Sequence, residues 1–356
     1  MLSSCRSDHL AATEPAEGAA DGGHTNDGAG RQLSARQLAL ARGRAYGLLG
    51  RLFLAGVTSS NLAHVQAVPE LNDKLALPFE ADEAAADHHH LFGFNVHPYQ
   101  SFFLDPAGLL GGPVTESVLR SYQSLGFQPE TSAESADHIG FELELLAFLC
   151  AAEAEALQDG LPEIAYQMRE HQLVFVQAHM LQWIGPLTLA VDQQAHRFYS
   201  ALAHVALDLL DEHAAALSSQ FDRPLQDAPA LPAVPEILED EGTGLKEIAD
   251  LLLTPVYSGI YLSRDDIGRL ARRQAIPRGF GDRRQLLSNL LRSAADYDAL
   301  GEVIDSLQAV AARWLAGYDE LSDREGAGVY IAGWRSRAAE TAAMLKQMHG
   351  RVEALD

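Results

Sequence analysis

The sequence predicts an all-α protein in two parts, a helical bundle over residues 35–216 and a smaller C-terminal helical domain over residues 243–356. Three observations support this fold class. Apolar residues recur at helical spacing along most of the chain. No segment alternates apolar and polar residues, and no Asn-Gly hairpin turn occurs. A proline-rich segment with an acidic end, residues 217–242, separates the two helical parts and is interpreted as a linker.

Residues 1–34 are rich in Ala, Gly, Asp, Glu and Ser and poor in large apolar residues. Such a composition cannot bury enough surface to offset the entropy lost on ordering, so a disordered tail is predicted there. Helical patterning begins after Ser34 and ends at Gly56, a residue type that often terminates helices. Further helices of the first part are expected over residues 113–127, 135–157, 162–184 and 188–216.

Local signals define some of these boundaries. Ser135 or Asp137 is expected to cap the helix that follows them. The next helix is expected to stop at Gly185-Pro186. Glu142 and Glu144 fall on the flanks of an apolar stripe, where carboxylates are usually solvated. Their spacing places them on different helix faces, which argues against a paired-carboxylate catalytic site.

In the second part, Ser263 and Asp266 have the spacing of a capping box. Helices are expected before Pro255, after Ser263, and over residues 282–293, 296–318 and 329–352.

The formal net charge is −23. This charge disfavours nucleic acid and anionic lipid as partners and favours a basic peptide, although it also serves solubility alone. The two cysteines, Cys5 and Cys150, cannot form a disulfide framework, which fits a reducing compartment. No run of 18 apolar residues occurs and no apolar stretch precedes Cys5, so neither a membrane span nor a signal peptide is expected. The predicted location is the cytoplasm, without stable membrane insertion.

Catalytic motifs are missing from the sequence. No HExxH, GxSxG, Walker loop or strand-linked GxGxxG is present, so no enzyme, no catalytic residue and no cofactor are predicted. The Asp-His-His-His run at residues 87–90 is interpreted as a solvated loop, and His171 and His179 as core or groove histidines, rather than metal ligands. Arginines cluster at residues 264–284, where they could bind phosphate or an acidic segment, or pair with acids of the chain itself.

Residues 97–112, HPYQSFFLDPAGLLGG, form an apolar, turn-rich segment between helices. Phe102, Phe103 and Leu104 could wall a groove for a peptide, with Asp137 and His138 supplying polar contacts. Equally, the two phenylalanines could be core residues and Asp137 only a helix cap. The residues alone leave both interpretations open.

Several short motifs in this region resemble the TorD/DmsD/NarJ group of maturation chaperones, over roughly residues 36–215. They are Tyr99 to Asp105, Gly112 to Thr115, Tyr122 to Phe127, Asp137-His138, Trp183 to Leu187 and Phe198-Tyr199. The loop that commonly reads Glu-Pro-x-Asp-His in this group reads Glu134 to His138 here, with Ser135 in place of the proline. The loop therefore lacks the residue that would fix its backbone φ angle.

The resemblance implies an all-helical cytoplasmic chaperone, not an enzyme. Its partners would be the catalytic subunit of a molybdopterin-dependent oxidoreductase and the twin-arginine (Tat) signal peptide of that subunit. The chaperone would bind the signal peptide and delay export until the cofactor is inserted and the enzyme is assembled. Such enzymes serve anaerobic respiration. Segment exchange between chains would allow a homodimer. Carried onto the matching positions, the resemblance places the peptide-binding residues at Tyr99, Phe102, Phe103, Leu104, Asp105, Asp137, His138 and Trp183. The alternatives are an adaptor that joins subunits without recognising a signal peptide, and a nucleotide-binding or nucleotide-hydrolysing protein that uses Arg283 and Arg284.

Overall fold

A computed structural model describes residues 33–108, 110–129, 134–225, 227–237, 243–277 and 279–354. The predicted disordered tail, residues 1–34, lies outside this range except for its last two residues. Ser34 to Asp356 form one compact unit. Within the described residues all regular elements are helical, and the only β-type pairing is one isolated bridge, so the predicted all-α fold class is confirmed.

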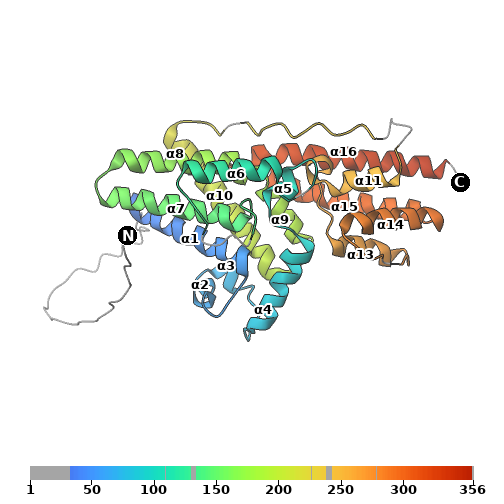
Figure 1. Cartoon of the computed structure of the whole chain (residues 1–356), viewed down its shortest axis with the longest axis horizontal. Helices are drawn as coiled ribbons and strands as arrows, with labels where there is room; N and C mark the ends of the chain where they lie inside the picture. Colours follow the sequence, from blue (N-terminus) through green and yellow to red (C-terminus); the bar gives the residue numbers. More distant parts are fainter. Residues whose placement is uncertain are drawn as a thin grey trace, which may run out of the picture. The chain divides into compact units, whose positions relative to one another are not determined.

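The first half of this unit contains the elements α1 to α10 and two irregular helices (Figure 1). Their bounds are α1 Ala35–Ala55, α2 Leu62–Gln66, α3 Pro69–Asn72, α4 Ala81–His88, the π-helix η1 His89–Asn95, α5 Gln100–Leu104, α6 Gly112–Ser124, α7 Ile139–Gln158, α8 Pro162–Ala178, the 3-10 helix η2 Met180–Gln182, α9 Ile184–Asp192 and α10 Arg197–Phe221.

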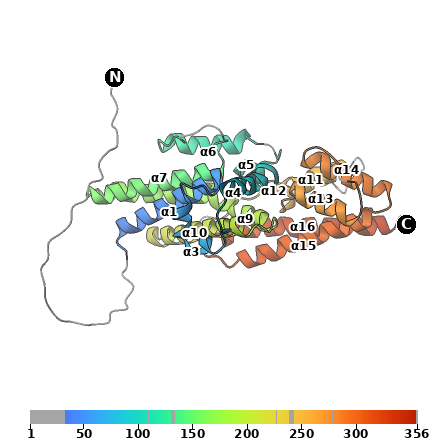
Figure 2. The same ribbon diagram turned by 90° about the horizontal axis from the view of Figure 1, so that it is seen from below.

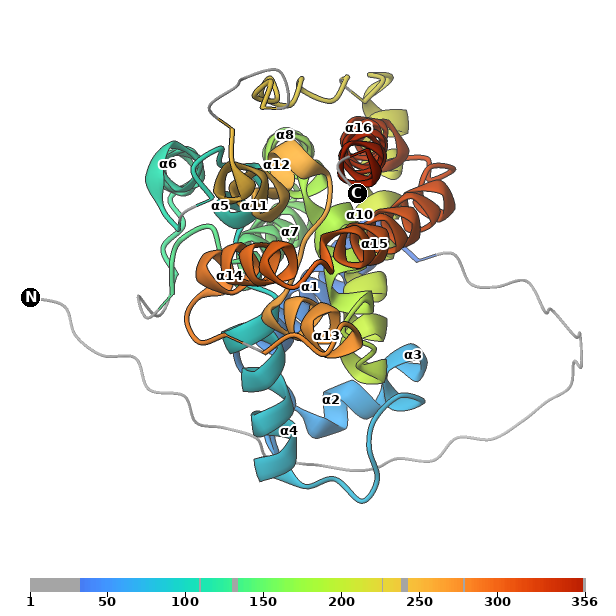
Figure 3. The same cartoon turned by 90° about the vertical axis from the view of Figure 1, so that its right-hand side faces the viewer.

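The second half contains α11 to α16. Their bounds are α11 Leu245–Leu253, α12 Pro255–Ser258, α13 Arg264–Arg273, α14 Arg283–Asp296, α15 Leu300–Leu321 and α16 Gly328–Glu353. The last two form a long antiparallel hairpin (Figure 2), and α14 packs against both α11 and α13 (Figure 3).

Local capping explains two of the helix ends. The Ser34 side chain accepts a hydrogen bond from the Gln37 backbone and α1 stops at Gly56, as the sequence predicts. The predicted capping box of Ser263 and Asp266 is also present at the start of α13. These helix ends are therefore determined by residues that lie within a few positions of them in the sequence.

Two predicted boundaries were wrong. The helix expected to stop at Gly185-Pro186 ends at Ala178, and Pro186 lies inside α9, where a first-turn residue needs no intrahelical N–H partner. The single helix expected over residues 188–216 is two helices, because Ala195 adopts a positive φ of 56° and the His196 side chain caps α10.

The segment between α10 and α11 has no helix among its described residues, in line with its prolines. It passes beside α16, where the Arg337 guanidinium donates to the carbonyl oxygens of Leu231 (3.3 Å) and Pro232 (2.7 Å) (Figure 1). The hydrophobic core nevertheless continues from one helical half into the other: the Trp334 indole N–H donates to the Gln182 carbonyl at 2.8 Å. The division into two domains stays a prediction.

None of the described helices alone has the length and apolar character to cross a membrane, whereas one bent pair, Pro162–Gln182 with Ile184–Asp192 at 43°, meets both criteria when taken together.

Helices α1 and α7 approach closely through two facing glycines. A Cβ atom built on Gly50 would lie 2.8 Å from the carbonyl oxygen of Gly140, and one on Gly140 would lie 2.9 Å from the carbonyl oxygen of Gly50. Because both obstacles are backbone atoms, a side chain here would push the helices apart.

We therefore expect Gly50→Ala to lower the free energy of unfolding by about 1–3 kcal/mol through overpacking. Gly47→Ala is the matched control on the same helix, because its Cβ would meet nothing closer than 3.5 Å. That control should be neutral or gain up to about 1 kcal/mol from helix propensity. Urea denaturation of both variants measures the difference; equal stabilities would show that the helices have room to separate.

Candidate functional site

The candidate site is built on a short backbone pairing between the start of α5 and the start of α7. Tyr99 and His138 form an isolated antiparallel bridge. On either side of it, the Gln100 N–H donates to the Asp137 carbonyl at 2.9 Å and the Ile139 N–H donates to the Pro98 carbonyl at 3.0 Å. Two motifs that lie far apart in the sequence are therefore joined.

The buried side chain of Asp137 stabilises this junction by hydrogen bonds. Its side chain is fully buried, and Oδ2 accepts a hydrogen bond from the Ser101 backbone N–H at 2.8 Å. The Ser135 hydroxyl donates to Oδ1. Because both carboxylate oxygens are engaged inside the protein, Asp137 positions the loop in this structure.

His138, rather than Ser135 or Asp137, caps α7. Its Nδ1 accepts a hydrogen bond from the Gly140 backbone at 3.0 Å, so that nitrogen carries no proton. Burial, with a smaller contribution from nearby His88, lowers the pKa of His138 to about 3, which keeps the ring neutral. The Tyr99 ring packs edge-on against it at 5.0 Å.

The predicted residues divide by exposure. Tyr99, Phe102 and Leu104 are partly exposed, and the Tyr99 hydroxyl donates to the exposed carboxylate of Glu134. The remaining predicted residues are buried, namely Phe103, Asp105, Asp137, His138 and Trp183. Their role in peptide binding stays a prediction.

Asp105 ends α5 by forming a turn. Its Oδ1 accepts a hydrogen bond from the Ala107 N–H at 2.7 Å, and its carbonyl accepts from Gly108 at 2.9 Å. The carboxylate is thus used locally to direct the chain away from the short helix.

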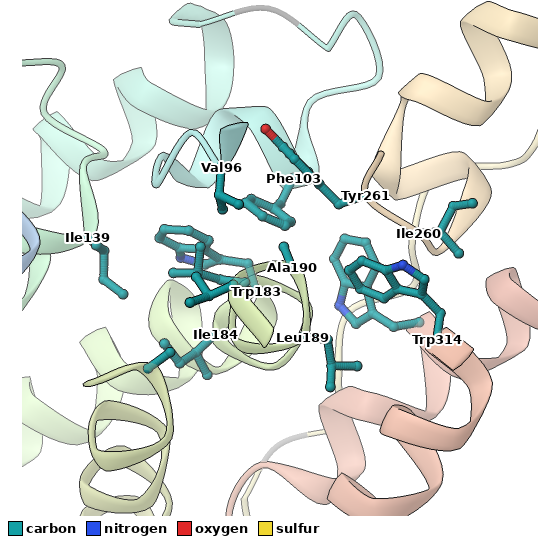
Figure 4. Close-up of a cluster of buried hydrophobic side chains, with 14 of the residues drawn as sticks. Val96, Phe103, Ile139, Trp183, Ile184, Leu189, Ala190, Ile260, Tyr261 and Trp314 are labelled. Carbon is teal, nitrogen blue, oxygen red and sulfur yellow. The ribbon is translucent and has the colours of Figure 1, made fainter. Parts of the chain in front are cut away.

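Phe103 and Trp183 are core residues. Phe103 packs between Trp183, at a ring separation of 5.5 Å, and Tyr261, at 5.3 Å (Figure 4). The core interpretation therefore holds for Phe103, whereas its neighbour Phe102 lies at the surface of the same helix.

Glu142 was expected to be solvated, and this is wrong. The side chain is completely buried, and its Oε2 accepts a hydrogen bond from the Trp183 indole at 3.3 Å. Burial raises its pKa well above the usual value, and the negative charge of Asp137 raises it further. No local pattern predicts this burial, since the hydrogen-bond partner lies 41 residues away in the sequence.

A groove of about 470 Å³ lies next to the junction. Gln100 and His179 lie at its polar part, with His179 Nδ1 3.2 Å from the Gln100 side-chain oxygen and His179 Nε2 2.9 Å from the Ser121 hydroxyl. Burial lowers the pKa of His179 to about 4, so the ring is neutral. The apolar lining comes mainly from Leu104, Pro113, Val114, Val256 and Leu231. Sequence reasoning did not identify Gln100 as a groove residue.

A second pocket, of about 340 Å³, lies between α4 and the start of α10. Its wall includes Phe79 and Tyr199. The charged side chains of its lining are four carboxylates and two cations, namely Asp73, Glu80, Glu83, Asp87, Lys74 and Arg197, so acidic groups are in excess. Such a combination suits a basic residue that carries an apolar chain.

The histidine-rich segments are structural. Residues 87–90 were expected in a loop, but they span the end of α4 and the start of η1, where the His88 Nε2 lies 2.9 Å from the Phe53 carbonyl. His179 is buried, but His171 is exposed, so the two do not share an environment. In the part of the chain that the structure describes, no group of three or more His, Cys, Asp and Glu side chains could hold a metal ion.

A comparison with protein-family models finds one family that resembles part of this chain. Residues 61–189 match the family described as nitrate reductase delta subunit. The similarity to that family is confined to this segment of the 356-residue chain. No curated protein and no solved structure matches the chain. The predicted kinship with the NarJ and TorD type of chaperone is thereby confirmed.

Nitrate reductase delta subunit family proteins are molybdoenzyme maturation chaperones. The matched segment runs from just before α2 into α9 and contains all eight predicted peptide-binding residues. It also contains most of the groove lining, whereas the arginines after residue 260 lie outside it.

The burial of Glu142 predicts that the stability of the protein depends on pH. Because the pKa of Glu142 is raised on folding, the carboxyl group stays neutral in the folded protein while it ionises in the unfolded chain above about its usual value of 4.5. It therefore costs stability increasingly as pH rises above that value. Glu142→Gln keeps the acceptor for Trp183 and removes the ionisation. We expect its Tm to match the wild type near pH 4 and to exceed it progressively toward pH 8.

Thermal unfolding of both proteins across this range measures the difference. The control is Glu155→Gln, which changes an exposed carboxylate on the same helix and should give a difference that varies little with pH. A Glu142→Gln advantage that is independent of pH would contradict the neutral state.

Proposed function

We propose that this chain is a cytoplasmic maturation chaperone that binds the N-terminal segment, including the Tat signal peptide, of a molybdopterin oxidoreductase catalytic subunit. Binding would hold back export while the cofactor is inserted and the subunits assemble. The observation that carries the proposal is that the family match, residues 61–189, includes the whole Tyr99–His138 junction and most of the groove beside it.

The groove suits an extended, largely apolar peptide. Its walls are largely apolar, with Ser117 and Arg120 among them, while Gln100, His179 and Gln182 offer polar side chains that can fix the peptide backbone. The wall formed by residues 229–232 is itself extended and rich in proline. An apolar stretch of a signal peptide therefore has a surface of matching chemistry.

The acidic surface suits the arginine pair of such a peptide. Glu134, beside Tyr99, is exposed, and the pocket between α4 and α10 has four carboxylates in its lining. Carboxylates bind guanidinium groups by charge-assisted, often bidentate hydrogen bonds. The net charge of −23 would also speed the encounter with a basic segment.

Within this proposal Asp137 and His138 act mainly by positioning. They hold the strand-like junction that presents Tyr99 and the rim of the groove, and Phe103 and Trp183 support that junction from the core. Asp137→Ala is then expected to weaken peptide binding by loosening the junction while the helical content is kept.

The experiment compares three clients from the same genome: the molybdopterin oxidoreductase catalytic subunit, the same subunit without its N-terminal segment, and the isolated N-terminal peptide. Binding of the first and third but not the second supports the proposal. Equal binding of the full and truncated subunits would favour the subunit-joining adaptor instead. Release of phosphate from GTP or ATP by the purified chain would favour the nucleotide alternative.

The groove itself is tested by Val114→Asp. A charge placed on its apolar wall should weaken binding of the N-terminal peptide by roughly tenfold or more, as is typical for a central interface residue. Fluorescence anisotropy with a labelled peptide measures the change.

Leu119→Asp is the matched control, because Leu119 is 40% exposed on the same helix and does not line the groove. Unchanged binding by Val114→Asp, with both variants folded by circular dichroism, would place the peptide elsewhere.

A further inference from the structure

A pocket of about 320 Å³ lies where the C-terminal helices meet the segment around η1 and α5. We call it the arginine pocket. Arg264, Arg283 and Arg284 line it together with the rings of Phe94 and Phe102, and Asp282 supplies its one carboxylate. A pocket with this excess of positive charge stands out in a chain whose net charge is −23.

The charges of two of these arginines are not neutralised by carboxylates. Arg284 forms an ion pair with Asp250 at 2.9 Å. The guanidinium of Arg264, in contrast, makes no ion pair or hydrogen bond with a described residue, and that of Arg283 donates only to the Leu262 carbonyl, at 3.0 Å. The Arg283 guanidinium lies over the Tyr261 ring at 4.5 Å, which fixes its position and leaves most of its five N–H donors for a ligand.

Both arginines begin a helix. Arg264 is the first residue of α13 and Arg283 the first residue of α14. A helix N-terminus carries partial positive charge, which adds to the positive charge that each arginine brings to the pocket.

The acids near these arginines are already engaged. Asp266 pairs with Arg269, Asp265 lies 3.1 Å from His90 Nε2, and Asp282 Oδ1 accepts from the Gln285 backbone at 2.8 Å. Asp266 and Asp282 also cap the two helices, so the helix ends are satisfied, whereas the guanidinium groups of Arg264 and Arg283 have no carboxylate partner among the described residues.

We propose that the arginine pocket binds a phosphate group, held by the guanidinium groups of Arg264 and Arg283. Planar guanidinium forks match the oxygens of phosphate, whose charge near −2 balances the two unpaired arginines. Burial and the positive charges of Arg283 and Arg264 lower the pKa of His97, also in the lining, to about 4, so this ring adds no charge of its own.

Two sources of phosphate fit this chemistry, free phosphate and a phosphate ester on a planar ring. Phe94 is 45% exposed and lies in the lining, where a ring attached to the phosphate could stack on it. None of the three arginines lies within residues 61–189, so the proposal is independent of the proposed chaperone function.

Isothermal titration calorimetry of the full chain tests it with three probes at constant ionic strength: inorganic phosphate, guanosine monophosphate and guanosine. We expect saturable binding of one phosphate-bearing probe per chain. Tighter binding of the monophosphate identifies an ester on a ring, and equal affinities identify the free group. Binding of guanosine alone, or no binding of any probe, would overturn the proposal.

Variants locate the site. Arg264→Gln should weaken phosphate binding by about tenfold or more, the typical loss for a hydrogen bond to a charged group. Arg283→Lys keeps the charge but removes the fork and should weaken it less. Arg273→Gln is the control on α13, because Arg273 is exposed and outside the pocket. Equal affinity for all three variants and the wild type would also overturn the proposal.

Discussion

The packing of Phe103 between Trp183 and Tyr261 joins three parts of the chain that are far apart in sequence (Figure 4). Each ring pair contributes about 0.5–1.5 kcal/mol beyond the burial of its apolar area. The junction and the arginine pocket each contact one of these rings. Trp183 reaches Glu142 at the start of α7, and Tyr261 carries the guanidinium of Arg283. Displacing Phe103 would therefore disturb the junction and the arginine pocket together.

Buried polar groups then determine how the junction is held. The carboxylate of Asp137 is satisfied by the Ser101 N–H and the Ser135 hydroxyl, and His138 is satisfied as a neutral cap. Glu142, by contrast, has Oε1 buried without a hydrogen-bond partner among the described residues. A neutral carboxyl group tolerates such a position far better than an ionised one. The environment around α7 thus keeps two neighbouring acids in different states: one fully hydrogen-bonded, one protonated.

Sequence reasoning succeeded where the determining contacts are local. The predicted cap at Ser263 depends on Asp266, three positions away, so its pattern was readable. It failed where a tertiary contact determines the burial of a residue or the boundary of a helix. Glu142 is buried because Trp183 lies over it, and Pro186 continues a helix because it occupies the first turn of α9. The residue types of the candidate site were identified, but their exposure was not, since exposure depends on which neighbours the fold brings to them.

The phenylalanine pair in α5 shows why the choice between groove wall and core could not be made from the sequence. Successive helical residues point about 100° apart, so in a helix of this length the two rings cannot share an environment. Phe103 is buried and Phe102 faces the arginine pocket, while Leu104 lines the groove. One short helix therefore serves both proposed surfaces. Moving it would empty the space that Phe103 fills, at a cost of about 3–5 kcal/mol for a buried aromatic side chain. Typical coupling energies between binding sites are about 1–3 kcal/mol, too small to meet that cost. A phosphate group and a peptide should thus bind independently, with α5 acting as a fixed partition between them.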